Sequence, residues 1–244
     1  MTPWVRNILI ANVVVFLVTM SFPDVTGRLM FVPALIALRP WTAVTYMFVH
    51  ASITHILFNM LGLYFFGSRL EARLGSQRFL ALYFISGLTG ALLSVFFTPH
   101  VAIIGASGAI FGVMLGYARY WPRDLVYVWG VFPVQARWMV AAMTVLSLYG
   151  GLHPGQSITA HFAHLGGFLG GLVYLVWSDR HTPAARFRAR TTPTADLDRW
   201  SRITGEGLHP INYDELMRLR QKITTGGASS LTPDERAFLD RLSA

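Results

Sequence analysis

The chain of 244 residues contains no cysteine, which excludes disulfide bonds, iron–sulfur clusters and catalysis by a thiol. Charged residues are also scarce: they make up 13% of the chain, against about 25% in an average soluble domain. Hydrophobic residues make up 53% and the mean hydropathy is +0.46. This composition predicts a polytopic membrane protein.

The few charges are unevenly distributed along the chain. Residues 1–178 contain nine arginines and three acidic residues, whereas residues 179–244 contain eleven basic and nine acidic ones. We therefore expect a membrane domain at 1–178, a linker rich in Pro, Thr and Arg at 179–206, and a small cytoplasmic helical hairpin at 207–244. This tail is interpreted either as a solvated hairpin without chemistry or as a docking segment for a partner.

The sequence pI of about 10.3 does not indicate a nucleic-acid-binding protein. In the membrane domain the excess of arginine is spread thinly over short connections, and no basic stripe interleaved with aromatic residues occurs. The arginines that open the tail have two readings, contact with anionic lipid or a role in topology alone. The first apolar run lacks a following cleavage site of small residues and is interpreted as a retained membrane helix.

Six apolar segments are candidates for membrane-spanning helices. The connections between them alternate in arginine content, so the positive-inside rule predicts that both termini are cytoplasmic. The second, fourth and sixth helices then run from outside to inside, and their polar N-terminal ends meet near the outer face. The predicted fold is an all-α bundle of six transmembrane helices with a soluble helical tail. The expected spans are 4–21, 50–68, 78–97, 105–119, 137–151 and 160–178.

The stretch GASGAIFG at residues 105–112 opens the fourth helix with Ser107 between small residues. Gly105 and Gly108 have two readings. Small residues allow close packing of helices in lipid, and they also allow backbone N–H groups at a helix N-terminus to approach a reacting carbonyl.

A histidine near the start of the sixth helix is a candidate base for Ser107. Gly167 and Gly171 follow His164 at i+3 and i+7, which puts this histidine on the helix face that can approach a neighbour most closely. A serine needs an adjacent base to act as a nucleophile. His161, one turn earlier, is a rival for the role but has no glycine at i+3.

The second helix carries His55 and Asn59, which share one face at i and i+4. Their side chains are suitable donors to an oxyanion, and an interhelical hydrogen bond is the plainer interpretation. His50 lies a turn earlier. Several histidines raise the alternative of a metal site, but HExxH is absent and the carboxylates of the membrane domain lie in loops. We expect no metal, and a dyad rather than a Ser-His-Asp triad.

Together, HASITHILFNMLGLYFFG, GASGAIFG and AHLGGFLGG resemble the rhomboid intramembrane serine proteases of the bacterial six-helix form, in chain order and on helices two, four and six. The resemblance covers about residues 4–178. It implies that Ser107 is the nucleophile and His164 the general base, and that His55, Asn59 and the Ser107 N–H form an oxyanion hole, with His50 as a further matching histidine. Trp41 matches the tryptophan of the family's Trp-Arg motif, but Thr42 follows it.

The resemblance implies a serine endopeptidase that hydrolyses peptide bonds in or near transmembrane helices of other membrane proteins, without a cofactor. It also implies a location in the lipid bilayer of a bacterial inner membrane, with the active site open to the outer face. The alternative is a catalytically silent rhomboid-like protein that binds transmembrane clients. In that case the glycines would serve packing alone.

Overall fold

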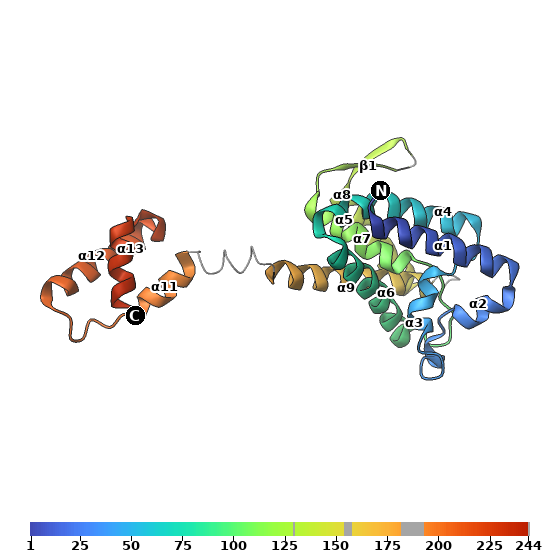
Figure 1. Cartoon of the computed structure of the whole chain (residues 1–244), viewed down its shortest axis with the longest axis horizontal. Coiled ribbons are helices and arrows are strands. Elements are labelled where there is room, and N and C mark those ends of the chain that lie inside the picture. The colour runs from blue at the N-terminus through green and yellow to red at the C-terminus, as the bar shows by residue number, and fades with distance from the viewer. Residues whose placement is uncertain (129, 154–157, 182–192, 244) are drawn as a thin grey trace. The chain divides into compact units, whose positions relative to one another are not determined.

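The computed structural model describes residues 1–128, 130–153, 158–181 and 193–243, and the chain forms two compact units, Met1–Trp177 and Ser178–Ala244. Figure 1 shows the larger unit as a bundle of helices with one small hairpin. Its elements are α1 (Pro3–Ser21), α2 (Pro23–Leu29), η1 (Pro33–Leu35), α3 (Thr42–Thr45), η2 (Tyr46–Phe48), α4 (Ile53–Gly62), η3 (Leu63–Gly67), α5 (Ser68–Leu74), α6 (Ser76–Phe97), α7 (Ser107–Tyr120), β1 (Leu125–Val128), β2 (Phe132–Gln135), α8 (Ala136–Leu152) and α9 (Ile158–Arg180).

Each of the six predicted segments forms a helix. Among the described residues, α1 and α6 are each long and apolar enough to cross a membrane. A third candidate span is the bent pair of helical segments Thr42–Phe48 and Ile53–Leu74, if the two segments together form one span. At 1.5 Å per residue the 14 residues of α7 extend about 21 Å, less than the roughly 30 Å of a bilayer core. The count of six spans stays a prediction.

The second predicted span differs from the expectation at both ends. It begins at Ile53 rather than at residue 50, because the Ser52 hydroxyl caps the helix by accepting a hydrogen bond from the His55 N–H. It continues through the π-helical turn η3 into α5 and ends at Leu74, because Gly75 follows with a φ of 81°. The connection to α6 is therefore much shorter than the predicted one.

The start of α1 is fixed by a buried carboxylate from α5. Glu71 accepts hydrogen bonds from the backbone N–H groups of Trp4 (3.2 Å) and Val5 (2.9 Å) and from the hydroxyl of Ser76. The first N–H groups of a helix have no intrahelical acceptor, and a negative charge there is favoured by the helix dipole. Glu71 therefore ties the N-terminal helix to the end of the second span.

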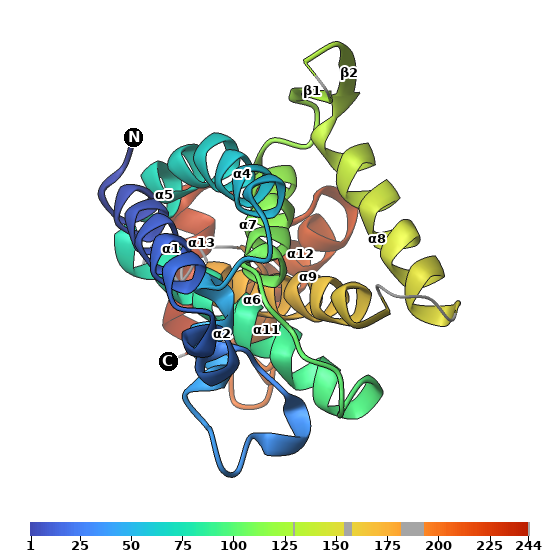
Figure 2. The same ribbon diagram turned by 90° about the vertical axis from the view of Figure 1, so that its right-hand side faces the viewer.

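Helix α7 lies in the middle of the larger unit, with α4, α6 and α9 around it (Figure 2). Ten of its 14 residues are buried. The connection from α7 to α8 contains the antiparallel hairpin β1–β2, whose register pairs Leu125 with Gln135 and Val128 with Phe132. In Figures 1 and 2 the hairpin and the N-terminus lie at one end of this unit, and α2 lies toward the other.

The smaller unit contains α11 (Pro193–Ser201), α12 (Pro210–Gly226), η4 (Ala228–Ser230) and α13 (Pro233–Leu242). Helix α13 begins with a capping box, since the Thr232 hydroxyl accepts from the Glu235 N–H and the Glu235 carboxylate accepts from the Thr232 N–H. The structure differs from the sequence interpretation at α11, which forms inside the segment 179–206 expected to be a linker. It does so because Trp200 packs into one core with Leu216 and Leu239.

Candidate active site

The side chains of Ser107 and His164 meet at the N-terminal end of α7. Ser107 is the first residue of α7, and its Oγ lies 2.9 Å from Nε2 of His164 on α9, within hydrogen-bonding distance. The His164 ring stacks on Phe111, with ring centroids 3.9 Å apart and an interplanar angle of 16°. Phe111 lies one helical turn after Ser107, so a single face of α7 supplies the hydroxyl and fixes the orientation of the imidazole.

Glycine pairs bring α7 and α9 close enough for this contact. A Cβ added to Gly167 would lie 1.9 Å from the carbonyl oxygen of Gly108, and one added to Gly171 would lie 2.9 Å from Cα of Gly112. Such distances leave no room for any other residue. The glycines at i+3 and i+7 from His164 are therefore the contact surface that the sequence predicts.

His55 lies over the loop that leads into α7. A Cβ on Gly105 would be 2.6 Å from Nε2 of His55, and Gly105 has a φ of 113°, so only glycine fits this position. Nδ1 of His55 accepts a hydrogen bond from the Ala51 N–H at 3.4 Å. The neutral ring therefore carries its proton on Nε2, the nitrogen that faces the start of α7.

Asn59 lies one turn after His55 on the same face of α4 and is buried. Its amide nitrogen donates to the His55 carbonyl at 2.8 Å. Because an amide group has two N–H donors, one remains for a ligand. Both Asn59 and His55 line the same groove as Ser107 and His164.

His50 is buried behind His55, with the ring centroids 4.9 Å apart in an edge-on arrangement. Its Nδ1 lies 3.4 Å from the Phe48 carbonyl, and its Nε2 has no hydrogen-bond partner among the described residues. The structure thus brings His50 next to the site but not into contact with the Ser107 hydroxyl. No group of three or more metal-binding side chains occurs within the described part of the chain.

Ser107 Oγ lies within hydrogen-bonding distance of His164, whereas His161, the alternative base, contacts α8. A Cβ on Gly150 of α8 would lie 2.2 Å from its Nε2, so the ring packs against α8. The His161 and His164 ring centroids are 6.3 Å apart.

The segment between α1 and α4 is held by side-chain hydrogen bonds, with Thr42 following Trp41. Trp41 Nε1 donates to the Arg28 carbonyl at 3.1 Å and the Arg39 guanidinium to the Gly27 carbonyl at 3.0 Å. Phe31 and Ile103 exchange two backbone hydrogen bonds. The pairing of Phe31 with Ile103 attaches this segment to the loop that precedes Ser107.

A groove of about 1410 Å³ contains the Ser107–His164 pair and extends along α7 to the hairpin. Its walls come from α4 and η3, from α7 and the loop before it, and from the hairpin and parts of α8 and α9. None of the described residues that line it is Asp, Glu, Lys or Arg. An apolar groove of this extent suits a hydrophobic chain segment rather than a soluble peptide.

The sequence interpretation missed Phe111 and the hairpin side chains Leu125 and Tyr127, which also line this groove. The i+4 spacing of Ser107 and Phe111 could have indicated that Phe111 lies on the same helix face as Ser107. The hairpin residues carry no comparable signal, because a short apolar run does not distinguish a strand from a helix.

The Rhomboid domain family matches residues 37–178 of the chain. Rhomboid-like protease 3 of Toxoplasma gondii is 29% identical over 177 residues, which are 71% of this chain and 60% of that protein. RHOMBOID-like protein 1 of Arabidopsis thaliana is 36% identical over 136 residues, 54% of this chain and 33% of that protein. Rhomboid-like protein 11, chloroplastic, of the same plant is 35% identical over 151 residues, 58% of this chain and 53% of that protein. The matched segment thus spans less than two thirds of each of these relatives.

Proposed function

The chain belongs to the rhomboid family, and on that premise we propose that it is an intramembrane serine endopeptidase that acts through a dyad of Ser107 and His164. The observation that carries the proposal is the 2.9 Å contact between Ser107 Oγ and His164 Nε2 inside an apolar groove. A nucleophile and its base within hydrogen-bond reach are the minimum for acyl transfer by serine.

In the proposed reaction, Ser107 Oγ attacks the scissile carbonyl while His164 Nε2 takes the hydroxyl proton. His164 then gives this proton to the leaving amine, and an ester links the substrate acyl group to Ser107. Water, deprotonated by His164, hydrolyses the ester and restores the serine. Stacking on Phe111 keeps the imidazole in position through both steps.

The negative charge that develops on the carbonyl oxygen needs donors at the start of α7. The backbone N–H of Ser107 has no acceptor within its own helix. The Nε2 proton of His55 and the second amide proton of Asn59 are the side-chain donors we assign to this oxyanion. The role of His50 in the proposal is to support the His55 ring from behind.

The proposed substrates are transmembrane segments of other proteins, cut in or near the outer part of the helix. In this proposal the C-terminal end of α7, marked by Arg119, Tyr120 and Trp121, lies at the cytoplasmic boundary of the bilayer. Because α7 is about 10 Å shorter than the bilayer core, Ser107 then lies about 10 Å below the outer boundary. A substrate helix hides its carbonyls, so residues with low helix propensity near the cut favour cleavage.

The protein is an integral membrane protein. We propose a bacterial inner membrane with both termini in the cytoplasm, since the positive-inside rule assigns arginine-rich connections to that side. The smaller C-terminal unit is then cytoplasmic, and the alternatives of docking a partner and of a role without chemistry both stay open for it.

The test is cleavage of a transmembrane substrate by the purified full-length protein in mild detergent. Ser107→Ala and His164→Ala should each abolish cleavage. Two matched controls should retain it: Ser94→Ala, a buried serine bonded to its own helix at the Gly90 carbonyl, and His161→Ala, whose ring packs against α8. A folded wild-type protein that binds the substrate without cutting it would favour the catalytically silent, client-binding alternative.

A further inference from the structure

The hairpin β1–β2 lies at the opposite end of α7 from Ser107, yet it lines the same groove. Leu125, Val126, Tyr127 and Gly130 belong to the groove wall together with Ser107 and His164. From Ser107 to Tyr117, another lining residue, α7 extends about 15 Å, the length of about ten helical residues. The volume of about 1410 Å³ exceeds the range of about 300–1,000 Å³ found for small-molecule pockets.

The two faces of the hairpin differ. Val126 and Val134 pack against the core of the larger unit. Successive side chains of a strand point to opposite faces, so Leu125 and Tyr127 share the other face, and they are 53% and 60% exposed. Large apolar side chains that project into a groove form a contact surface for an apolar ligand.

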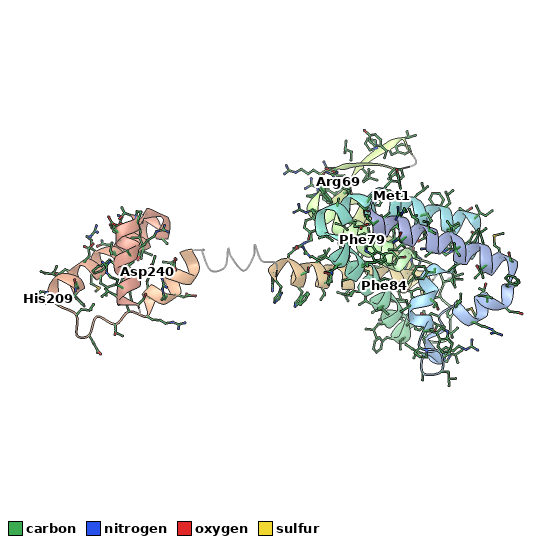
Figure 3. All side chains as sticks on the ribbon, in the orientation of Figure 1. Met1, Arg69, Phe79, Phe84, His209 and Asp240 are labelled. Atoms are coloured by element: carbon green, nitrogen blue, oxygen red, sulfur yellow. The ribbon has the colours of Figure 1, made fainter. Side chains whose placement is uncertain are left out.

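The base of the hairpin is held firmly by α5 and α7. The Asp124 carboxylate accepts hydrogen bonds from the Tyr117 hydroxyl and the Arg69 guanidinium, and the Asp124 carbonyl accepts from the Ala136 N–H at 2.9 Å. The Arg69 guanidinium also lies 4.3 Å from the ring centroid of Trp121. Figure 3 shows Arg69 on the side of this unit from which the hairpin projects. An isolated two-stranded hairpin is only marginally stable, so these contacts position it in advance of binding.

We propose that the hairpin β1–β2 is the docking surface for the cytoplasmic half of the substrate's transmembrane helix, and that Leu125 and Tyr127 select bulky apolar residues there. The proposal rests on the proposed protease function. The occupant follows from three observations: the groove is continuous with the Ser107–His164 pair, it lacks charged lining residues among those described, and its length below Ser107 matches about ten helical residues. Arg69, Tyr117 and Asp124 act as positioning residues.

The test compares two transmembrane substrates that differ only in the region about ten residues to the cytoplasmic side of the mapped cut. One has leucine and phenylalanine there, and the other has alanine. The wild-type protein should prefer the bulky substrate, and Tyr127→Ala should lower the ratio of the two kcat/KM values about tenfold, since one lost apolar contact changes discrimination by at least that factor. The matched control is Phe132→Ala on the same hairpin, which is 63% exposed but does not line the groove, and its ratio should equal that of the wild type.

A second measurement uses a photo-crosslinking amino acid at position 127 or 132 in the Ser107→Ala background. Adducts with the substrate helix are expected from position 127 and not from 132. If the wild-type protein cuts neither substrate, the proposed function fails. If it cuts both, but Tyr127→Ala leaves the ratio unchanged or Phe132→Ala lowers it equally, the docking proposal fails and the protease proposal stands.

Discussion

The glycine contact between α7 and α9 predicts that Gly167→Ala impairs the proposed proteolysis, although position 167 does not contact the Ser107 hydroxyl. The added methyl group would lie 1.9 Å from the Gly108 carbonyl oxygen, and real Cβ atoms are essentially never closer than 3.0 Å to another heavy atom. The obstacle is backbone, which has no rotamer to change. The two helices must therefore separate by about 1 Å at the residue next to Ser107.

A separation of this size breaks the contact between nucleophile and base. Starting from 2.9 Å, the Ser107–His164 distance would become about 4 Å, beyond hydrogen-bond range. A misplacement of about 1 Å lowers catalytic rates about 100-fold, which corresponds to about 2.7 kcal/mol of transition-state stabilisation. Overpacking should also destabilise the fold by about 1–3 kcal/mol.

The assay measures kcat for a transmembrane substrate and the thermal midpoint in the same detergent. The matched control is Gly151→Ala on α8, where the added Cβ meets the Phe162 ring at an ordinary 3.4 Å, and both quantities should stay close to wild type. Cleavage by Gly167→Ala within threefold of the wild-type rate, with an unchanged midpoint, would refute the close packing on which the site geometry depends.

Three further predictions concern other parts of the molecule. Glu71→Gln removes the charge that accepts from the Trp4 and Val5 N–H groups and should lower the free energy of unfolding by about 1–3 kcal/mol; an unchanged thermal midpoint would count against this anchor. The pKa of the Glu235 carboxyl is lowered to about 2 by the Lys222 ammonium, which donates to both of its oxygens, and by the Thr232 N–H. The ionised carboxylate therefore stabilises the smaller unit fully above pH 4.5, and this stabilisation is lost as the pH falls toward 2. The protection factors of amides in residues 210–242 of the full-length protein, which compare observed with intrinsic exchange rates at each pH, should fall over that window. They should fall less in Glu235→Gln, whereas equal profiles would contradict the assignment. Chelation of divalent metals should leave cleavage unchanged, and a loss that added metal restores would contradict a mechanism based on Ser107 and His164 alone.

Much of the candidate site follows from local spacing in the sequence. The i, i+4 relation of His55 and Asn59 and the positions of the glycines after His164 depend only on helix periodicity. The structure brings His55 and Asn59 into one groove with Ser107 and His164, and it packs the glycines against α7. The six helical segments were likewise predicted from apolar length. Alternating arginine content also predicts the direction of each helix across the membrane, and this orientation stays a prediction.

Other features depend on tertiary contacts that no local pattern records. The strand Leu125–Val128 is a short apolar run, and it becomes a hairpin because Gly130 adopts a φ of 72° and Asp124 is held by α5 and α7. Helix α11 forms in a segment of linker-like composition because Trp200 finds a core in the same unit. The π-helical turn at Leu63–Gly67, which extends the second span, has no sequence signal that we can identify.

The central claim is that Ser107 is an activated nucleophile. The most direct test is to treat the folded full-length protein with a fluorophosphonate and to identify the modified residue by mass spectrometry. The account predicts one adduct, on Ser107, that is lost in His164→Ala and retained in His161→Ala. A folded protein that forms no adduct, or that carries it on another serine, would contradict the account.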